Sequence, residues 1–202
     1  MFNIGIDFDN TIVNYNNSFY ELALEKNLIR PNTEKSKKAI RDILVKEGKE
    51  SEFTLLQGEV YGPRILNASP SENSVEVIKK LGKLGANIFI VSHKTKFPYA
   101  GPKYDLHKAA KEWLDYYSFL STKGANIKED RIFFNISKNE KINKIHNLKC
   151  HFFIDDLPEI LNMVDNNIIK ILYNRYQGSE KSKFNFISNN WSLVGDFISE
   201  YL

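Results

Sequence analysis

The sequence has very little of what builds covalent or membrane-anchored scaffolds. Its 202 residues include one cysteine, Cys150, which excludes an intrachain disulfide and any zinc site made from several cysteines. No apolar run is long enough to span a bilayer, and the first residues lack the charged-then-apolar pattern of a signal peptide. We therefore expect a cytoplasmic protein with no membrane partner.

Clustered charge of one sign is also missing. The formal net charge is +3, and 28 Lys and Arg residues are interspersed with 25 Asp and Glu residues. The longest basic tract, Lys35-Ser36-Lys37-Lys38, fits the solvated face of a helix better than a nucleic-acid-binding surface. With 42% hydrophobic and 13% aromatic residues, the composition predicts a folded globular protein that does not bind nucleic acid.

What is present is an alternation of apolar runs and amphipathic helical stripes. The runs predict five buried strands, at residues 2–6, 87–91, 131–135, 151–154 and 168–173. Alternation of strands and helices is typical of parallel sheets. The sequence therefore predicts an α/β fold with a doubly wound, five-stranded parallel sheet.

The segment after the first strand has a different character. Residues 14–68 are rich in Lys and Glu and carry apolar residues at helical spacing, which predicts three short helices. We expect Thr33 to cap the second helix and Gly58 to stop the third. The predicted organisation is an α/β core domain, residues 1–13 and 69–202, with a helical insertion at 14–68.

Two acids close the first predicted strand, in Asp7-Phe8-Asp9-Asn10-Thr11. Residues two apart on a strand project the same way, so Asp7 and Asp9 should both extend past its carboxyl end, where parallel sheets bind ligands. Such close carboxylates repel each other unless a cation lies between them or one is protonated. The pentapeptide alone predicts either metal-assisted chemistry or a simple turn, which Asp, Asn and Thr favour.

Further polar residues follow other strands. Ser92 ends the second strand, Asp155 and Asp156 end the fourth, and Lys138 and Lys141 begin the helix before the fourth. In one doubly wound sheet these groups lie on the same edge. Phosphoryl transfer to a carboxylate needs this combination, because Mg²⁺ and a lysine neutralise the phosphate dianion that the carboxylate would otherwise repel.

In this order and on these elements, the residues resemble the motifs of the haloacid dehalogenase superfamily of phosphohydrolases. The matching residues are Asp7, Asp9 and Thr11, then Ser92, then Lys141, and finally the pair Asp155-Asp156. The resemblance covers the sheet domain and implies a Rossmann-like core. The helical insertion occupies the place of the family's first type of cap, which selects substrates.

The resemblance also implies a role for each residue. Asp7 would attack phosphorus and form an aspartyl phosphate. Asp9 would protonate the leaving oxygen and later deprotonate water, while its backbone carbonyl binds Mg²⁺. Thr11 would steady the loop, and Ser92 and Lys141 would bind phosphate oxygens.

Three assignments rest on finer arguments. Asp156 is the expected direct metal ligand and Asp155 a partner of metal-bound water, because relatives with a Gly-Asp pair ligate through the second residue. We prefer Lys141 to Lys138 as the active-site lysine, since the residues after Lys141 begin the buried helix face.

The basic loop that starts with His93 and Lys94 lies next to Ser92 in the chain. It is either a substrate loop that contacts the rest of an anionic ligand or an exposed loop without one.

Together these features predict a Mg²⁺-dependent phosphatase of a small phosphorylated metabolite, of the phosphosugar or nucleotide class. Asp9 argues against carbon dehalogenation, which needs no acid for a halide leaving group. The alternatives are a receiver-like domain or a catalytically silent regulatory or binding protein. A receiver fits less well, because the third strand ends in Phe134-Asn135 and not in an acid.

Overall fold

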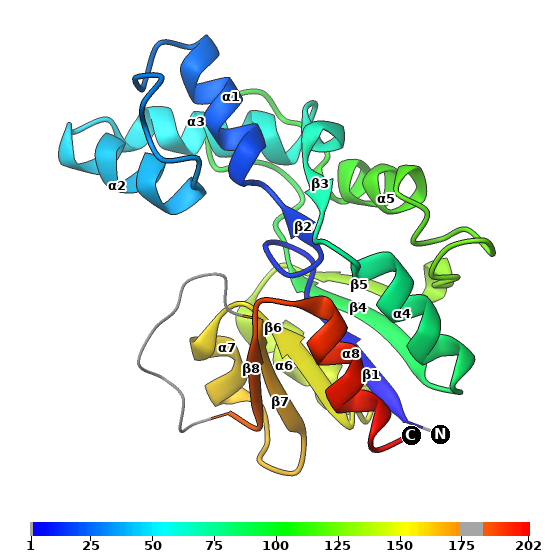
Figure 1. Ribbon diagram of the computed structural model, residues 1–202. Helices are drawn as coiled ribbons and strands as arrows, with labels where there is room; N and C mark the ends of the chain where they lie inside the picture. Colours follow the sequence, from blue (N-terminus) through cyan, green and yellow to red (C-terminus); the bar gives the residue numbers. More distant parts are fainter. Residues whose placement is uncertain (1, 174–183) are drawn as a thin grey trace. The chain divides into compact units, whose positions relative to one another are not determined.

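Figure 1 shows the chain as a computed structural model, which describes residues 2–173 and 184–202. The chain divides into two compact units. One contains the segments up to Val13, Pro70–Lys94 and Tyr117–Leu202, and the other contains Asn14–Ser69 and Thr95–Tyr116. Among the described residues, no helix has the length and apolar character needed to cross a membrane.

In the part of the chain that the structure describes, the first unit is built on one parallel sheet of six strands in the order β5-β4-β1-β6-β7-β8. The strands are β1 (Asn3–Ile6), β4 (Asn87–His93), β5 (Ile132–Asn135), β6 (Phe152–Asp155), β7 (Ile169–Tyr173) and β8 (Phe186–Ser188). The α/β fold and the five predicted strands are confirmed. The predicted strand count was one too low, because β8 has only three residues, all half-buried, and shows no alternation to detect.

The order of the strands makes β1 the point where the sheet changes direction. From β1 the chain goes to β4 and β5 on one side, then crosses to β6, β7 and β8 on the other. Open α/β sheets bind ligands at such a switch point, outside the carboxyl ends of the strands. The residue that follows β1 is Asp7, whose backbone N–H donates to the Ile154 carbonyl at 2.9 Å.

Residues 4–6 of strand β1 are buried, as expected of a central parallel strand. Ile4 and Ile6 are fully buried. A Cβ on Gly5 would lie only 2.6 Å from a ring carbon of Phe153, so glycine is needed for this ring to pack beside β1. Close packing at this position fixes the path of β1 and the start of the loop after it.

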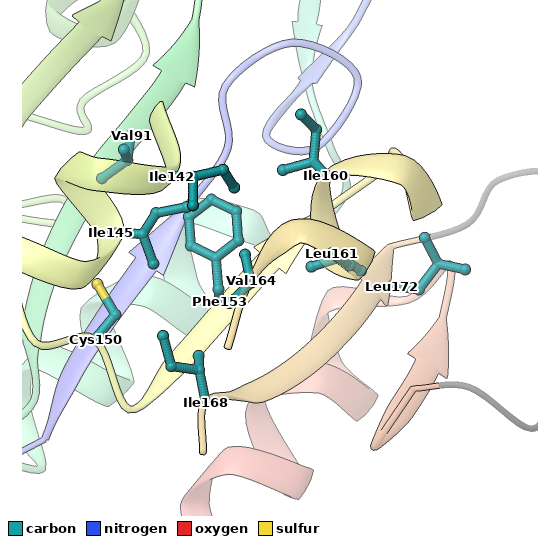
Figure 2. Close-up of a cluster of buried hydrophobic side chains, with 10 residues drawn as sticks. All are labelled: Val91, Ile142, Ile145, Cys150, Phe153, Ile160, Leu161, Val164, Ile168 and Leu172. Atoms are coloured by element: carbon teal, nitrogen blue, oxygen red, sulfur yellow. The ribbon is translucent and has the colours of Figure 1, made fainter. Parts of the chain in front are cut away.

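Helices cover both faces of the sheet. A buried cluster joins one face to α6 (Lys138–Asn147) and α7 (Pro158–Met163), as Figure 2 shows. Its members are Val91, Ile142, Ile145, Cys150, Phe153, Ile160, Leu161, Val164, Ile168 and Leu172. On the other face, the ring of Tyr173 lies 5.6 Å from that of Trp191 in α8 (Trp191–Ser199), which also packs on α4 (Ser74–Lys83). A short 3₁₀ helix, Glu129–Arg131, precedes β5.

The second unit is helical and contains α1 (Asn16–Glu25), α2 (Lys37–Lys46), α3 (Glu50–Tyr61), a 3₁₀ turn (Ile65–Asn67) and α5 (Leu106–Tyr116). The three predicted helices of the insertion are confirmed, with two corrections. Ser36, and not Thr33, caps α2, its Oγ accepting from the Ala39 N–H at 3.1 Å. Helix α3 continues through Gly58, where a Cβ would lie 3.1 Å from the Cβ of Pro98, so this glycine serves packing and does not end the helix.

The second unit also contains α5, which lies outside the predicted insertion boundaries of 14–68. The Trp113 side chain is fully buried and donates to the Ala68 carbonyl at 2.7 Å. This contact ties α5 to the end of the insertion.

Two short strands, β2 (Val13–Asn14) and β3 (Ser69–Pro70), form a separate two-stranded sheet.

Candidate active site

The centre of the site is a buried ion cluster at the carboxyl end of β1. Asp7 is 4% exposed, and Lys141 is 1% exposed. The Lys141 ammonium lies 2.6 Å from Asp7 Oδ1 and 2.5 Å from Asp155 Oδ2. One cation therefore joins the carboxylate that follows β1 to the one that ends β6, and these two strands are neighbours in the sheet.

Helix α6 places Lys141 in this position. Ser137 caps the helix by accepting the Glu140 N–H at 3.2 Å, and Ile142 and Ile145 anchor the buried side in the cluster of Figure 2. Lys138 is exposed and instead pairs with Glu159 at 2.9 Å. Of the two candidate lysines, the structure brings Lys141 to Asp7.

Burial controls the charges in this cluster. Desolvation raises the pKa of the fully buried Asp155 carboxyl to about 7, and the nearby Lys141 only partly offsets this effect. For Lys141, burial alone would lower the pKa, but the carboxylates of Asp155 and Asp7 outweigh it and raise the pKa above its ordinary range. The ammonium therefore stays charged, and it stabilises the two acids beside it.

A third carboxylate joins the group. Asp7, Asp155 and Asp156 each offer an oxygen, and these oxygens lie within 4.8 Å of one another. Three carboxylate oxygens gathered this closely are suited to a divalent cation. Hard oxygen donors without sulfur or imidazole fit Mg²⁺. Asp156 is the least buried of the three, and Asp155 Oδ1 already accepts the Leu157 N–H at 2.9 Å.

The loop after Asp7 is held by Thr11. This residue is fully buried, and its carbonyl accepts from Ser71 Oγ at 2.6 Å and from Trp191 Nε1 at 3.2 Å. Its hydroxyl donates to Asp7 Oδ2 at 3.5 Å. The motif alone could not reveal Ser71 or Trp191, because both are distant in sequence and act by donating to a backbone carbonyl.

Ser92 lies near the carboxyl end of β4. Ile90 is opposite Ile6 in the sheet, so Ser92, two residues further on, lies at the level of the loop that follows β1. It is 1% exposed, and its carbonyl accepts from Asn135 Nδ2 at 3.2 Å. The sheet thus brings Ser92 to the same edge as the acids.

The structure gives Lys94 a partner that the sequence did not indicate. Its side chain is 3% exposed, and its ammonium lies 2.9 Å and 3.0 Å from the two oxygens of Asp9. Lys94 is therefore part of the buried edge and is not an exposed loop residue. His93 is half-buried, with Nε2 3.3 Å from the Ile136 carbonyl.

Comparisons with known proteins find a sequence relative and several structures of similar fold. No family model matches the sequence. The chain is 26% identical over 145 residues to the "Putative nucleotidase" of Bacillus cereus, a match that covers 72% of this chain and 67% of that protein.

Solved structures with the same fold include a "predicted phosphatase" from Clostridium acetobutylicum, with a TM-score of 0.63, 13% identity and coverage of 98% of each chain. A HAD-superfamily hydrolase from Ehrlichia chaffeensis has a TM-score of 0.52, 16% identity and coverage of 98% of this chain and 95% of its own. The chain therefore has the fold of the haloacid dehalogenase superfamily, as its motifs predict.

Proposed function

We propose that the protein is a Mg²⁺-dependent phosphatase that hydrolyses a small phosphorylated metabolite through an aspartyl phosphate. The observation that carries the proposal is the buried Asp7–Lys141–Asp155 cluster at the switch point of the sheet. It places a carboxylate, the proposed nucleophile, beside a buried cation at the sheet edge where folds of this kind bind ligands.

In the proposed reaction Asp7 attacks phosphorus, and the bond to the leaving oxygen breaks as Asp9 gives that oxygen a proton. Water then attacks phosphorus in the aspartyl phosphate while Asp9 takes a proton from that water. The bond between Asp7 and phosphorus breaks, which frees inorganic phosphate and restores the Asp7 carboxylate. Lys141 orients Asp7 and balances charge on the phosphoryl oxygens, and Ser92 offers a hydroxyl to them.

The residues that would hold Mg²⁺ are Asp7, Asp155, Asp156 and the backbone carbonyl of Asp9. Three carboxylate oxygens within 4.8 Å of one another support this assignment. When bound, the ion supplies positive charge that lets an anionic nucleophile approach an anionic phosphate.

For the substrate we propose the nucleotide class ahead of phosphosugars, because the Bacillus cereus relative bears the name of a nucleotidase. The helical insertion follows the first motif, where the superfamily has a cap, so we assign substrate selection to it. Asp9 supports ester hydrolysis over dehalogenation, since a halide leaves without a proton.

The test is hydrolysis by the purified full-length protein of nucleoside monophosphates, sugar phosphates and p-nitrophenyl phosphate. We expect phosphate release with Mg²⁺, none with EDTA, and none from Asp7→Asn. Full turnover by Asp7→Asn would contradict the proposed nucleophile.

Two other outcomes would favour the alternatives. A stable aspartyl phosphate without turnover indicates a receiver-like protein. Binding without hydrolysis of any ester indicates a silent regulatory protein.

A further inference from the structure

Lys94 is a buried cation that the proposed reaction does not use. It is 4% exposed as a whole residue, which is rare for lysine. Its ammonium contacts both oxygens of Asp9, the proposed acid and base. Ordering a lysine side chain costs conformational entropy, so a lysine fixed in this way indicates a specific role.

The backbone at Lys94 is held independently of its side chain. The Lys94 backbone N–H donates to the Asn135 carbonyl at 2.8 Å. The side-chain amide of Asn135 donates through Nδ2 to the Ser92 carbonyl at 3.2 Å. Asn135 closes β5, so the segment from Ser92 to Lys94 is bonded to the neighbouring strand. The starting point of the lysine side chain is therefore fixed by the sheet.

The far end of the side chain is confined as well. The Lys94 ammonium lies 5.2 Å from the ring centre of Phe8, within the range of a cation–π interaction. Phe8 stands between Asp7 and Asp9 in the sequence, and its side chain is fully buried in the core. The same lysine thus contacts a ring fixed in the core and the carboxylate beside it.

Two contacts from one ammonium restrain the position of the Asp9 carboxylate. The Lys94 nitrogen lies 2.9 Å from one oxygen and 3.0 Å from the other, so it holds both oxygens at once. The Asp9 side chain keeps 21% of its surface exposed, so it remains open to a substrate on another side.

We propose that Lys94 is a positioning residue that orients Asp9 for proton transfer, an inference that rests on the proposed phosphatase function. In the first step the bond from phosphorus to the leaving oxygen breaks and the Asp9 proton moves to that oxygen. In the second step the Asp9 carboxylate takes a proton from the attacking water. Lys94 keeps its own protons throughout and holds the carboxylate in place.

The decisive measurement compares two leaving groups in the full-length protein with Mg²⁺. kcat/KM reports the steps up to departure of the leaving group. p-Nitrophenyl phosphate releases a stable anion that needs little help from an acid, whereas phenyl phosphate, of almost the same shape, releases a more basic one. If Lys94 acts through Asp9, the loss of kcat/KM in Lys94→Met should be roughly 10-fold or more larger on phenyl phosphate than on p-nitrophenyl phosphate. General acids contribute about 10²–10⁴-fold, so a loss of this size is within their range.

Two further variants complete the comparison. Lys94→Arg, which keeps the charge, is expected to recover most of the loss on phenyl phosphate. Lys80→Met removes an exposed lysine that pairs with Asp196 at 3.3 Å and should change neither substrate. Equal losses of Lys94→Met on both substrates, or no loss, would overturn the inference.

A second measurement does not depend on activity. In a crystal structure of Lys94→Met we expect the Asp9 carboxylate to rotate away from its present orientation or to become disordered. An unchanged Asp9 side chain would overturn the inference, even if the wild-type protein hydrolysed no phosphate ester. Absence of hydrolysis by the wild type overturns the proposed function and the proton-transfer role with it, and the crystal structure then still tests whether Lys94 orients Asp9.

Discussion

The Lys141 ammonium lies 2.6 Å from the Asp7 carboxylate, although the two residues are 134 positions apart in the chain. This ion pair is buried, and the same ammonium contacts Asp155 at 2.5 Å. A buried pair contributes little net stability, because desolvation offsets attraction, but removal of one partner leaves the other charge stranded. Lys141 therefore links the stability of the fold to the chemistry of the site.

Replacing Lys141 tests this link. Lys141→Met removes the charge that Asp7 and Asp155 share, and we expect a loss of about 3 kcal/mol or more in the free energy of unfolding. Lys138→Met is the matched control, since it removes an exposed lysine from the same helical turn and should change the value by about 0.5 kcal/mol or less. Urea unfolding with EDTA measures both. Similar losses for the two variants would contradict the assignment of Lys141.

The Asp155 carboxyl predicts a pH dependence of stability in the metal-free protein. Burial raises its pKa from the ordinary value of 3.8 to about 7, so the folded state binds the proton more tightly than the unfolded state. The contribution of this group is therefore present below pH 3.8 and is lost as pH rises towards 7. The Asp155→Asn variant has no ionisable group at this position, so it is the reference for the comparison.

The comparison uses urea unfolding at several values from pH 4 to pH 7.5 with EDTA. We expect the stability of the wild type relative to Asp155→Asn to fall as pH rises through this window. A difference that is independent of pH would show that Asp155 has no raised pKa.

A divalent cation is expected to stabilise the folded protein. Binding of Mg²⁺ to Asp7, Asp155 and Asp156 at roughly 100 times its Kd would add about 2.7 kcal/mol. Thermal unfolding with increasing MgCl₂ measures the effect, and Asp156→Asn should reduce it. Asp196→Asn, at an exposed carboxylate paired with Lys80, is the control and should respond as the wild type does. Equal responses of all three proteins would refute a site at Asp156.

Cys150 is expected to be chemically inert in the folded state. It belongs to the buried cluster of Figure 2, and desolvation raises the pKa of its thiol to about 12. Because the thiolate is the reactive form, a disulfide reagent at pH 8 should label the native protein very slowly and the urea-unfolded protein rapidly. Rapid labelling of the native state would show that the thiol is accessible.

The sequence was informative where structure is local. Period and length of the apolar runs revealed five strands of the sheet, and the polar residues at their ends gave the motif order from Asp7 to Asp156. The prediction missed β8, because a strand of three residues is too short to show a period. It was also wrong at Gly58, where glycine makes room for Pro98 and does not end the helix. Local patterns do not report which element a side chain will meet.

By itself, the sequence determined that acids, a serine and a lysine follow the strands of a parallel sheet, because strand polarity places all their carboxyl ends on one edge. Only the tertiary structure decided the partners. It brought Lys141 to Asp7 and sent Lys138 to Glu159, and it placed the Lys94 ammonium on both oxygens of Asp9. Such pairings depend on strand order, register and helix packing, and these arise from contacts between residues far apart in the chain.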